Sequence, residues 1–148
     1  MLLNQENKKL SYEYIRGLIE GEGCFTFSSR KGNNGHKYKV PAFSLSMHER
    51  DQELLFLIKG TLNLKNKIYN YKNDGYKRGR KAILIVREFG NLKNVIIPLF
   101  YNKLHGHKKQ QFLCWLEKIG QDPAVPESYK LLYRLHKCGF YNRHSKFD

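Results

Sequence analysis

The spacing of apolar residues along the chain first predicts helices. Apolar side chains that recur every three or four residues, with a capping residue before them and glycine or proline near their end, are typical of amphipathic helices. The pattern predicts five helices, which are residues 12–21 behind Ser11, a helix capped by Asp51, a short helix from Gly90 disturbed by Pro98, residues 107–119 closed by Gly120, and residues 127–137. The basic segment 138–148 at the end is expected to be loosely ordered.

Between the helices, apolar and polar residues alternate in the way that half-buried strands require. The strands expected from this alternation are residues 24–31, 37–47, 67–72 and 80–87, with turns at 32–35 and 73–75. The first two strands form a long hairpin in which Pro41, Phe43 and Leu45 share one side. The order of elements predicts a single α+β domain over residues 1–148, with a four-stranded antiparallel sheet backed by helices on one face.

The other face of this sheet is predicted to stay uncovered and to be polar and basic. Its residues are Ser28, Arg30, Ser44, Ser46, Lys67, Tyr69, Tyr71 and Lys81. A twisted sheet with such a face suits the DNA major groove, where side chains can reach the edges of the bases. A merely solvated face is the alternative, and a register error of one residue would exchange the two faces.

The charge balance narrows the class of partner. The chain of 148 residues has 27 lysines and arginines against 13 acidic residues, which gives a formal net charge of +14. This excess is spread along the chain and predicts a polyanionic partner. Nucleic acid is favoured over a membrane, because no segment is long and apolar enough to span a bilayer. No small-molecule cofactor is expected. A folded ribosomal or chromatin-like binder stays open, whereas an aromatic content of 14% argues against a disordered one.

The cysteines and the N-terminal residues bear on the compartment. None of the three cysteines lies in a C-x-x-C pair, so neither a disulfide framework nor a zinc ribbon is predicted. Residues 1–10 do not read as a secretory signal, so we expect an intracellular protein, in cytoplasm, nucleoid or an organelle matrix. His105 and His107 lack further ligands at zinc-site spacing, and the sequence contains no phosphate-binding loop motif.

Residues 14–23, Tyr-Ile-Arg-Gly-Leu-Ile-Glu-Gly-Glu-Gly, combine two unusual features. Gly17 and Gly21 lie one helical turn apart, although a glycine inside a helix costs about 1 kcal/mol relative to alanine, which favours close contact with another helix. Glu20 and Glu22 fall in the last turn, where the helix dipole disfavours negative charge. Two such helices packed through their glycines would bring carboxylates together, and a divalent metal would offset that charge. An ordinary core helix with a solvated acidic end is the alternative.

The segment from Ile15 to Gly23 resembles the LAGLIDADG motif of homing endonucleases in its apolar, glycine and acidic positions. It departs from that motif by Arg16 in place of a small residue and by glutamate in place of aspartate at both acidic positions. The resemblance implies the α-β-β-α-β-β-α fold of the family, with the polar sheet face on double-stranded DNA. For a chain with one motif it also implies a homodimer and a long, nearly palindromic site. The implied interface residues are Gly17, Leu18, Glu20 and Gly21.

The resemblance and the chemistry of phosphodiester hydrolysis together indicate metal ligands. Glu22 of each chain is the main expected ligand, and the backbone carbonyl of Gly21 is a second, because the last carbonyls of a helix lack partners. Such oxygen ligands suit Mg²⁺, with about two or three ions shared across the dimer, for which Mn²⁺ or Ca²⁺ can substitute in crystals. By resemblance, Glu20 has a structural place near the interface.

Basic residues complete the expected catalytic set. Lys108, at the start of a late helix, is similar to a lysine that the family points into its active site, where it can hold the scissile phosphate or tune the attacking water. A plain phosphate contact is the alternative, and Lys109 competes on helical register. Where the family often has glutamine after the second strand, this chain has Met47. His48 is therefore the expected water-ordering residue, with Arg50 as a weaker candidate.

The sequence thus predicts a homodimeric, Mg²⁺-dependent homing endonuclease, encoded in an intron, that cuts both DNA strands and leaves short 3′ overhangs. Two alternatives share the fold. An intron RNA maturase would bind structured RNA, and a catalytically silent DNA-binding module would not need Glu22 or Lys108. The presence of both residues favours the nuclease.

Overall fold

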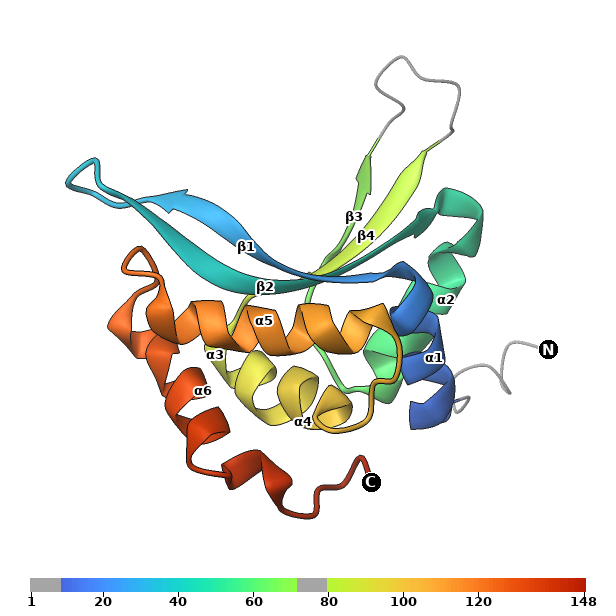
Figure 1. Cartoon of the computed structure of the whole chain (residues 1–148). Coiled ribbons are helices and arrows are strands. Elements are labelled where there is room, and N and C mark those ends of the chain that lie inside the picture. Colours follow the sequence, from blue (N-terminus) through green and yellow to red (C-terminus); the bar gives the residue numbers. More distant parts are fainter. Residues whose placement is uncertain (1–8, 72–79) are drawn as a thin grey trace.

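A computed structural model describes residues 9–71 and 80–148 of the chain (Figure 1). The helices are α1 (Tyr12–Glu22), α2 (Gln52–Thr61), α3 (Phe89–Asn91), α4 (Ile97–Phe100), α5 (His107–Gln121) and α6 (Glu127–Lys137). The strands are β1 (Gly23–Lys31), β2 (Lys37–His48), β3 (Ile68–Tyr71) and β4 (Lys81–Val86). The remaining turns are the 3-10 helices η2 (Glu49–Asp51) and η4 (Phe140–Asn142) and the π-helical η3 (Leu92–Ile96).

One antiparallel sheet carries the strands in the order β1-β2-β4-β3, and the helices cover one of its faces (Figure 1). The opposite face is concave and open. This arrangement confirms the predicted α+β class, the α-β-β-α-β-β-α order and the four-stranded antiparallel sheet backed by helices. The turn predicted at residues 73–75 lies outside the described residues. Within the described ranges, no helix combines the length and the apolar character needed to cross a membrane.

The side of the sheet that faces the helices is hydrophobic. Phe25 of β1 pairs with Phe43 of β2, and Phe43 pairs in turn with Val86 of β4. Leu45 and Leu84 form the neighbouring pair, and both are fully buried. The alternation predicted for the hairpin is therefore confirmed, because its phenylalanine and leucine side chains lie in the core.

An aromatic cluster holds helix α5 against strand β1. The ring of Phe25 lies 4.9 Å from that of Phe112 and 5.3 Å from that of Trp115, measured between centroids. Trp115 Nε1 donates a hydrogen bond to the carbonyl of Thr26 at 2.7 Å. Because the polar edge of the indole is satisfied there, this contact fixes the position of α5 along β1. It also places the N-terminus of α5 near the start of β1.

The helical segment between β4 and α5 is longer than predicted. The sequence indicated a short helix from Gly90, whereas α3, η3 and α4 follow one another without a break from Phe89 to Phe100. Pro98 lies in the first turn of α4, directly after the π-helical stretch. Proline cannot donate a backbone hydrogen bond, so the change of helical pattern just before it accommodates the residue without ending the segment.

Gly120 was expected to close α5, but the helix continues to Gln121. A Cβ atom at position 120 would overlap the ring of Tyr133 in α6. Close approach of two helices therefore requires this glycine, and that requirement depends on a residue from another element.

The C-terminal segment 138–148 is packed against the helices, whereas the sequence indicated a loosely ordered tail. Phe147 is 1% exposed, and its ring lies edge-on against that of Tyr12 with the centroids 4.9 Å apart. Arg16 of α1 donates from Nε to the carbonyl of Leu99 at 2.7 Å and from Nη2 to the carbonyl of Phe147. Arg16, the departure from the small residue of the motif, thus ties α1 to the C-terminal segment.

Replacing Gly120 by alanine should destabilise the protein. The new Cβ forces α6 away from α5, and overpacking of this kind costs about 1–3 kcal/mol, which outweighs the gain of up to about 1 kcal/mol in helix propensity. Thermal unfolding followed by circular dichroism measures the effect. Gly60→Ala in α2 is the matched control, because nothing lies within 4 Å of a Cβ there, and its melting temperature should be equal or higher. A melting temperature of Gly120→Ala at or above that of the wild type would contradict the packing argument.

Candidate active site

Helix α1 passes directly into strand β1, with no loop between them. Ser11 Oγ caps α1 by accepting a hydrogen bond from the backbone N–H of Tyr14 at 3.0 Å, and the helix ends at Glu22. Gly23 then begins β1 in an extended conformation, with φ of −79°, and donates its N–H to the carbonyl of Ile19. A Cβ on Gly23 would lie 3.0 Å from that carbonyl oxygen. Steric crowding at the junction, and not a left-handed turn, therefore requires glycine here.

Glu22 ends α1 with an exposed side chain. No described residue forms a hydrogen bond or an ion pair with its carboxylate. The carbonyl of Gly21 also belongs to the last turn, whose carbonyls lack helical partners. A free carboxylate beside a carbonyl oxygen is a donor set that fits Mg²⁺. Within the described part of one chain, no cluster of three or more His, Cys, Asp or Glu side chains could hold a metal. Glu22 therefore has no pair of acidic, histidine or cysteine side chains grouped with it among the described residues, and water, backbone oxygens or a second copy of the chain could complete the coordination.

Lys108 lies at the same end of α1. Its Nζ donates a hydrogen bond to the carbonyl of Gly23 at 2.6 Å, which places the ammonium beside the residue that follows Glu22. Lys108 is half-buried, whereas Lys109 is exposed and points elsewhere on the first turn of α5. Of the two lysines that the sequence left in competition, the structure brings Lys108 to the acidic end of α1.

The Glu20 side chain forms its hydrogen bonds within the chain. Its Oε1 accepts hydrogen bonds from the backbone N–H groups of His105 and Gly106, at 2.5 and 2.7 Å. Gly106 is the N-cap of α5, so Glu20 binds the N–H groups of the cap and of the residue before it and places a negative charge at the helix N-terminus. The two backbone hydrogen bonds lower the pKa of Glu20 below its ordinary value. This position agrees with a structural role and leaves Glu22 as the free carboxylate.

His48, the expected water-ordering residue, lies apart from the acidic end of α1. Its Nδ1 accepts a hydrogen bond from the backbone N–H of Arg50 at 3.1 Å, so the ring caps the turn η2. Gly23 pairs with Leu45, three residues before His48, which corresponds to about 10 Å along the strand. None of the described contacts joins His48 to Glu22 or Lys108.

The residues predicted for DNA binding share the open face of the sheet. Across β2, β4 and β3 they belong to two rows, Ser46–Ile83–Tyr69 and His48–Lys81–Tyr71. Ser44 lies between Cys24 and Ile85, and on β1 Ser28 and Arg30 follow in the same alternation. Lys67 directly precedes β3, with its Nζ 5.9 Å from the centre of the Tyr69 ring. The predicted register is therefore correct, while contact of these residues with DNA stays a prediction.

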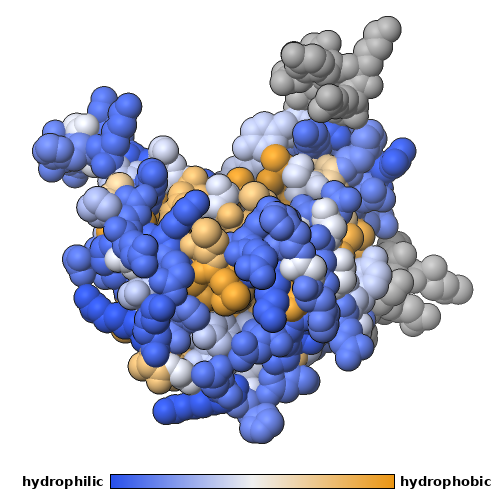
Figure 2. Space-filling view, in the orientation of Figure 1, coloured by the Kyte–Doolittle hydropathy of each residue, from blue (hydrophilic) through white to orange (hydrophobic). Residues whose placement is uncertain are grey.

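The open face also contains residues that the predicted DNA-binding set did not include. They are Cys24, Thr26, Tyr38, Val40, Ala42, Ile83 and Ile85. Continuing the alternation from Ser28 or from Lys81 along each strand would have identified them. Val40 and Ala42 are 7% and 1% exposed, so the face is less uniformly polar than predicted. Figure 2 shows apolar surface on the floor of the concave face and hydrophilic side chains at the tip of the β1–β2 hairpin.

Comparison with known sequences places the chain among endonucleases. The sequence model of the family described as LAGLIDADG endonuclease matches residues 15–119. A protein of Mycosarcoma maydis named probable intron-encoded DNA endonuclease 1 is 28% identical over 109 residues. That alignment covers 72% of this chain and 37% of the relative.

Solved structures show the same fold. The crystal structure of the I-LtrWI LAGLIDADG homing endonuclease bound to target DNA matches with a TM-score of 0.60 and 28% identity, over 81% of this chain and 40% of that one. I-SmaMI bound to uncleaved DNA in the presence of calcium ions matches with a TM-score of 0.62 and 22% identity, over 93% and 47%. The homing endonuclease I-TnaI matches with a TM-score of 0.57 and 17% identity, over 88% and 98%.

The chain therefore spans less than half the length of I-LtrWI, of I-SmaMI and of the curated relative, and nearly all of I-TnaI. The family match begins in α1, includes the whole described sheet and ends in α5, so it contains Glu22, Lys108 and the open face. Since it extends over more than half of the sequence, the chain belongs to the LAGLIDADG endonuclease family.

Proposed function

We propose that the chain is a homing endonuclease that makes Mg²⁺-dependent double-strand breaks in a long, nearly palindromic DNA site as a homodimer. The observation that carries this proposal is the meeting of Glu22 and Lys108 at one end of α1, where β1 begins. Cys24, two residues beyond Glu22, already belongs to the open face. A duplex on that face would therefore pass directly over the acidic end of the helix.

The chain's own groups can divide the work of phosphodiester hydrolysis. Glu22 and the carbonyl of Gly21 would hold Mg²⁺, with about two or three ions shared by the two chains. When bound, the metal supplies an acidified water and neutralises charge on the phosphate. The Lys108 ammonium, fixed by the Gly23 carbonyl, can bind a phosphate oxygen or the attacking water through its remaining N–H groups. His48 is positioned to contact DNA beside Lys81, and its role as a water-ordering residue remains a proposal.

Helix α1 has a free face that fits a second copy. Within the described chain, nothing lies within 4 Å of a Cβ atom built on Gly17 or Gly21. Tyr14, one turn earlier, is 49% exposed, and Leu18 is half-buried. Small residues one turn apart allow two helices to pack closely, and close packing here would bring the two Glu22 carboxylates together.

A two-fold dimer of this kind predicts a nearly palindromic site, because the symmetry of the site mirrors that of the protein. We propose that the cut leaves short 3′ overhangs and that the gene lies in an intron, as the name of the Mycosarcoma maydis relative says of that protein. An RNA maturase or a silent DNA-binding module does not require the free Glu22 carboxylate and the Lys108 contact, so these two features favour the nuclease.

Glu22→Gln should abolish cleavage and leave DNA binding nearly intact. A randomised duplex library incubated with and without Mg²⁺, followed by sequencing of the cut ends, defines the site on which the variant is assayed. Loss of a direct ligand should lower the cleavage rate by more than about a hundredfold, since even outer-shell partners cost 10–100-fold in metal affinity or activity. Glu13→Gln, an exposed change at the other end of the helix, is the control and should cleave normally. Equal rates for Glu22→Gln and the wild type would sink the assignment.

Comparing Lys108→Met with Lys109→Met distinguishes a lysine that acts in catalysis from one that only contacts a phosphate. Lys108→Met removes the ammonium at Gly23 and should reduce the single-turnover rate at saturating DNA by about 10–100-fold. Lys109→Met should leave that rate unchanged, and at most it weakens binding and lowers the salt slope by about one. Single-turnover cleavage and filter-binding measurements distinguish the two effects. A larger loss of rate in Lys109→Met would assign the role to the other lysine.

Gly17→Leu should prevent dimerisation without unfolding the chain. The added side chain meets no neighbour in the chain at its Cβ, and leucine has a better helix propensity than glycine by about 1 kcal/mol. Light scattering after size exclusion should therefore give the mass of a monomer for Gly17→Leu and of a dimer for the wild type. Gly60→Leu, at an equally open helical position, is the control and should stay dimeric. A dimer of Gly17→Leu would exclude this face as the interface.

A further inference from the structure

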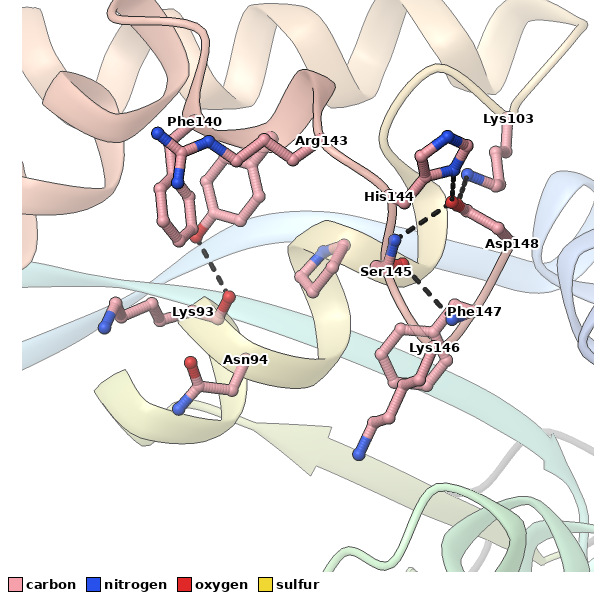
Figure 3. A pocket seen from close by; sticks show the side chains of 12 residues that line it. Lys93, Asn94, Lys103, Phe140, Arg143, His144, Ser145, Lys146, Phe147 and Asp148 are labelled. Atoms are coloured by element: carbon pink, nitrogen blue, oxygen red, sulfur yellow. Dashed lines mark hydrogen bonds and ion pairs between the residues drawn. The ribbon is translucent and has the colours of Figure 1, made fainter.

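A cavity of about 410 Å³ lies between the η3–α4 segment and the C-terminal residues, on the side of the helical layer away from the open sheet face (Figures 1 and 3). Pro98, Phe140, Tyr141 and Phe147 give it an apolar floor. Basic side chains stand around the floor, at Lys93, Lys103, Arg143, His144 and Lys146. The size is that of a typical ligand site, and none of its residues belongs to the sheet face or to the acidic end of α1.

The positive charge of this cavity is mostly uncompensated. Asp148 is the one acidic side chain among the lining residues, and it accepts hydrogen bonds from Lys103 Nζ at 2.7 Å and from the backbone N–H of Ser145 at 2.9 Å. These bonds, together with the contact of His144, hold the pKa of Asp148 below its ordinary value, so the carboxylate stays ionised and neutralises Lys103. Three cations remain without a carboxylate partner among the described residues, which are Lys93, Arg143 and Lys146. Figure 3 shows Lys93 and Lys146 extending in different directions from the cavity, so the three cations could contact phosphates at successive positions of one strand.

An aromatic surface lies beside these cations. Phe140 is 37% exposed, and its ring is held edge-on against Tyr141 with the centroids 5.2 Å apart. The Tyr141 hydroxyl donates to the carbonyl of Lys93 at 3.0 Å and thereby fixes the floor to η3. The Arg143 guanidinium lies 5.4 Å from the centre of the Phe140 ring, as Figure 3 shows from close by. With the guanidinium over one face of the Phe140 ring, a base can stack on the exposed remainder of the ring while its phosphate lies near the cation.

We propose that this cavity binds one unstacked nucleotide of a single-stranded nucleic acid, with the base on Phe140 and the phosphates on either side of it held by Arg143, Lys93 and Lys146. A single strand is required because a base inside a duplex has no free face to stack on an aromatic ring. A second hollow of about 340 Å³ shares Lys103, Tyr141, Arg143, His144 and Asp148 with the first and gives room for the adjacent nucleotide. This site is independent of duplex cleavage on the sheet.

Fluorescence anisotropy with the full chain tests the proposal on labelled single-stranded RNA, single-stranded DNA of the same sequence and duplex DNA. Phe140→Leu keeps apolar volume but removes the ring, and should raise the Kd for the single strand about tenfold, within the range measured for base stacking on aromatic side chains. The double variant Lys93→Glu with Lys146→Glu should weaken the same binding and lower its salt slope by roughly one to two. The matched control, Lys65→Glu with Lys118→Glu, makes the same charge change at two exposed lysines outside the cavity.

A variant of the sheet face tests whether single strands and duplexes bind at different sites. Lys67→Glu with Lys81→Glu should weaken duplex binding and leave single-strand binding unchanged, while the cavity variants do the reverse and still cleave duplex DNA. Whichever single strand binds more tightly, RNA or DNA, is the source of the nucleotide. Unchanged single-strand affinity in Phe140→Leu would overturn the proposal. So would an equal loss in the control double variant, because the binding would then reflect net charge alone. Melting curves of each variant establish that a loss of affinity is not a loss of fold.

Discussion

The direct passage of α1 into β1 is the constraint on which the candidate active site depends. Gly23 lies so close to Ile19 that a Cβ would be 2.5 Å from the Ile19 Cγ2 atom and 3.0 Å from its carbonyl oxygen, and the Gly23 carbonyl accepts a hydrogen bond from the Lys108 ammonium at 2.6 Å. Because no loop intervenes, the last helical residue, Glu22, has a fixed position relative to the first strand of the sheet. A carboxylate, a lysine and the edge of the open face are thus brought together by one covalent junction and one hydrogen bond.

The charged side chains of α1 differ in where they find partners: Glu20 and Arg16 are bound within the chain, whereas Glu22 has no partner among the described residues. Glu20 lies at the C-terminal end of α1, where the helix dipole disfavours it, but it reaches the N-terminus of α5, where the dipole favours it. Arg16 is likewise turned inward, onto carbonyls of Leu99 and Phe147. With these charges satisfied inside the chain, the face of α1 that carries Gly17 and Gly21 stays free of them. This division allows one short helix to be a core element and a source of the free Glu22 carboxylate, while its glycine face remains open for the second copy that we propose.

Two surfaces with different chemistry carry part of the net charge of +14. The open sheet face presents rows of serine, tyrosine and lysine over a partly apolar floor, a shape that follows a duplex groove. The cavity at the C-terminal segment combines lysines and an arginine with an exposed ring, which suits an unpaired base. The helical layer separates the two (Figure 1), so occupation of one does not block the other.

The sequence by itself determined the elements, the α+β class, the faces of the strands and the motif helix, because these follow from local periodicity and from side chains a few residues apart. It also pointed to Glu22 and to the pair Lys108 and Lys109. Only the tertiary structure placed Lys108 at the Gly23 carbonyl, placed His48 away from the acidic end, showed why position 120 must be glycine, and ordered the C-terminal segment around Phe147. Each of these depends on a partner distant in sequence, such as the carbonyl that Arg16 meets 131 residues away, and local patterns carry no information about such partners.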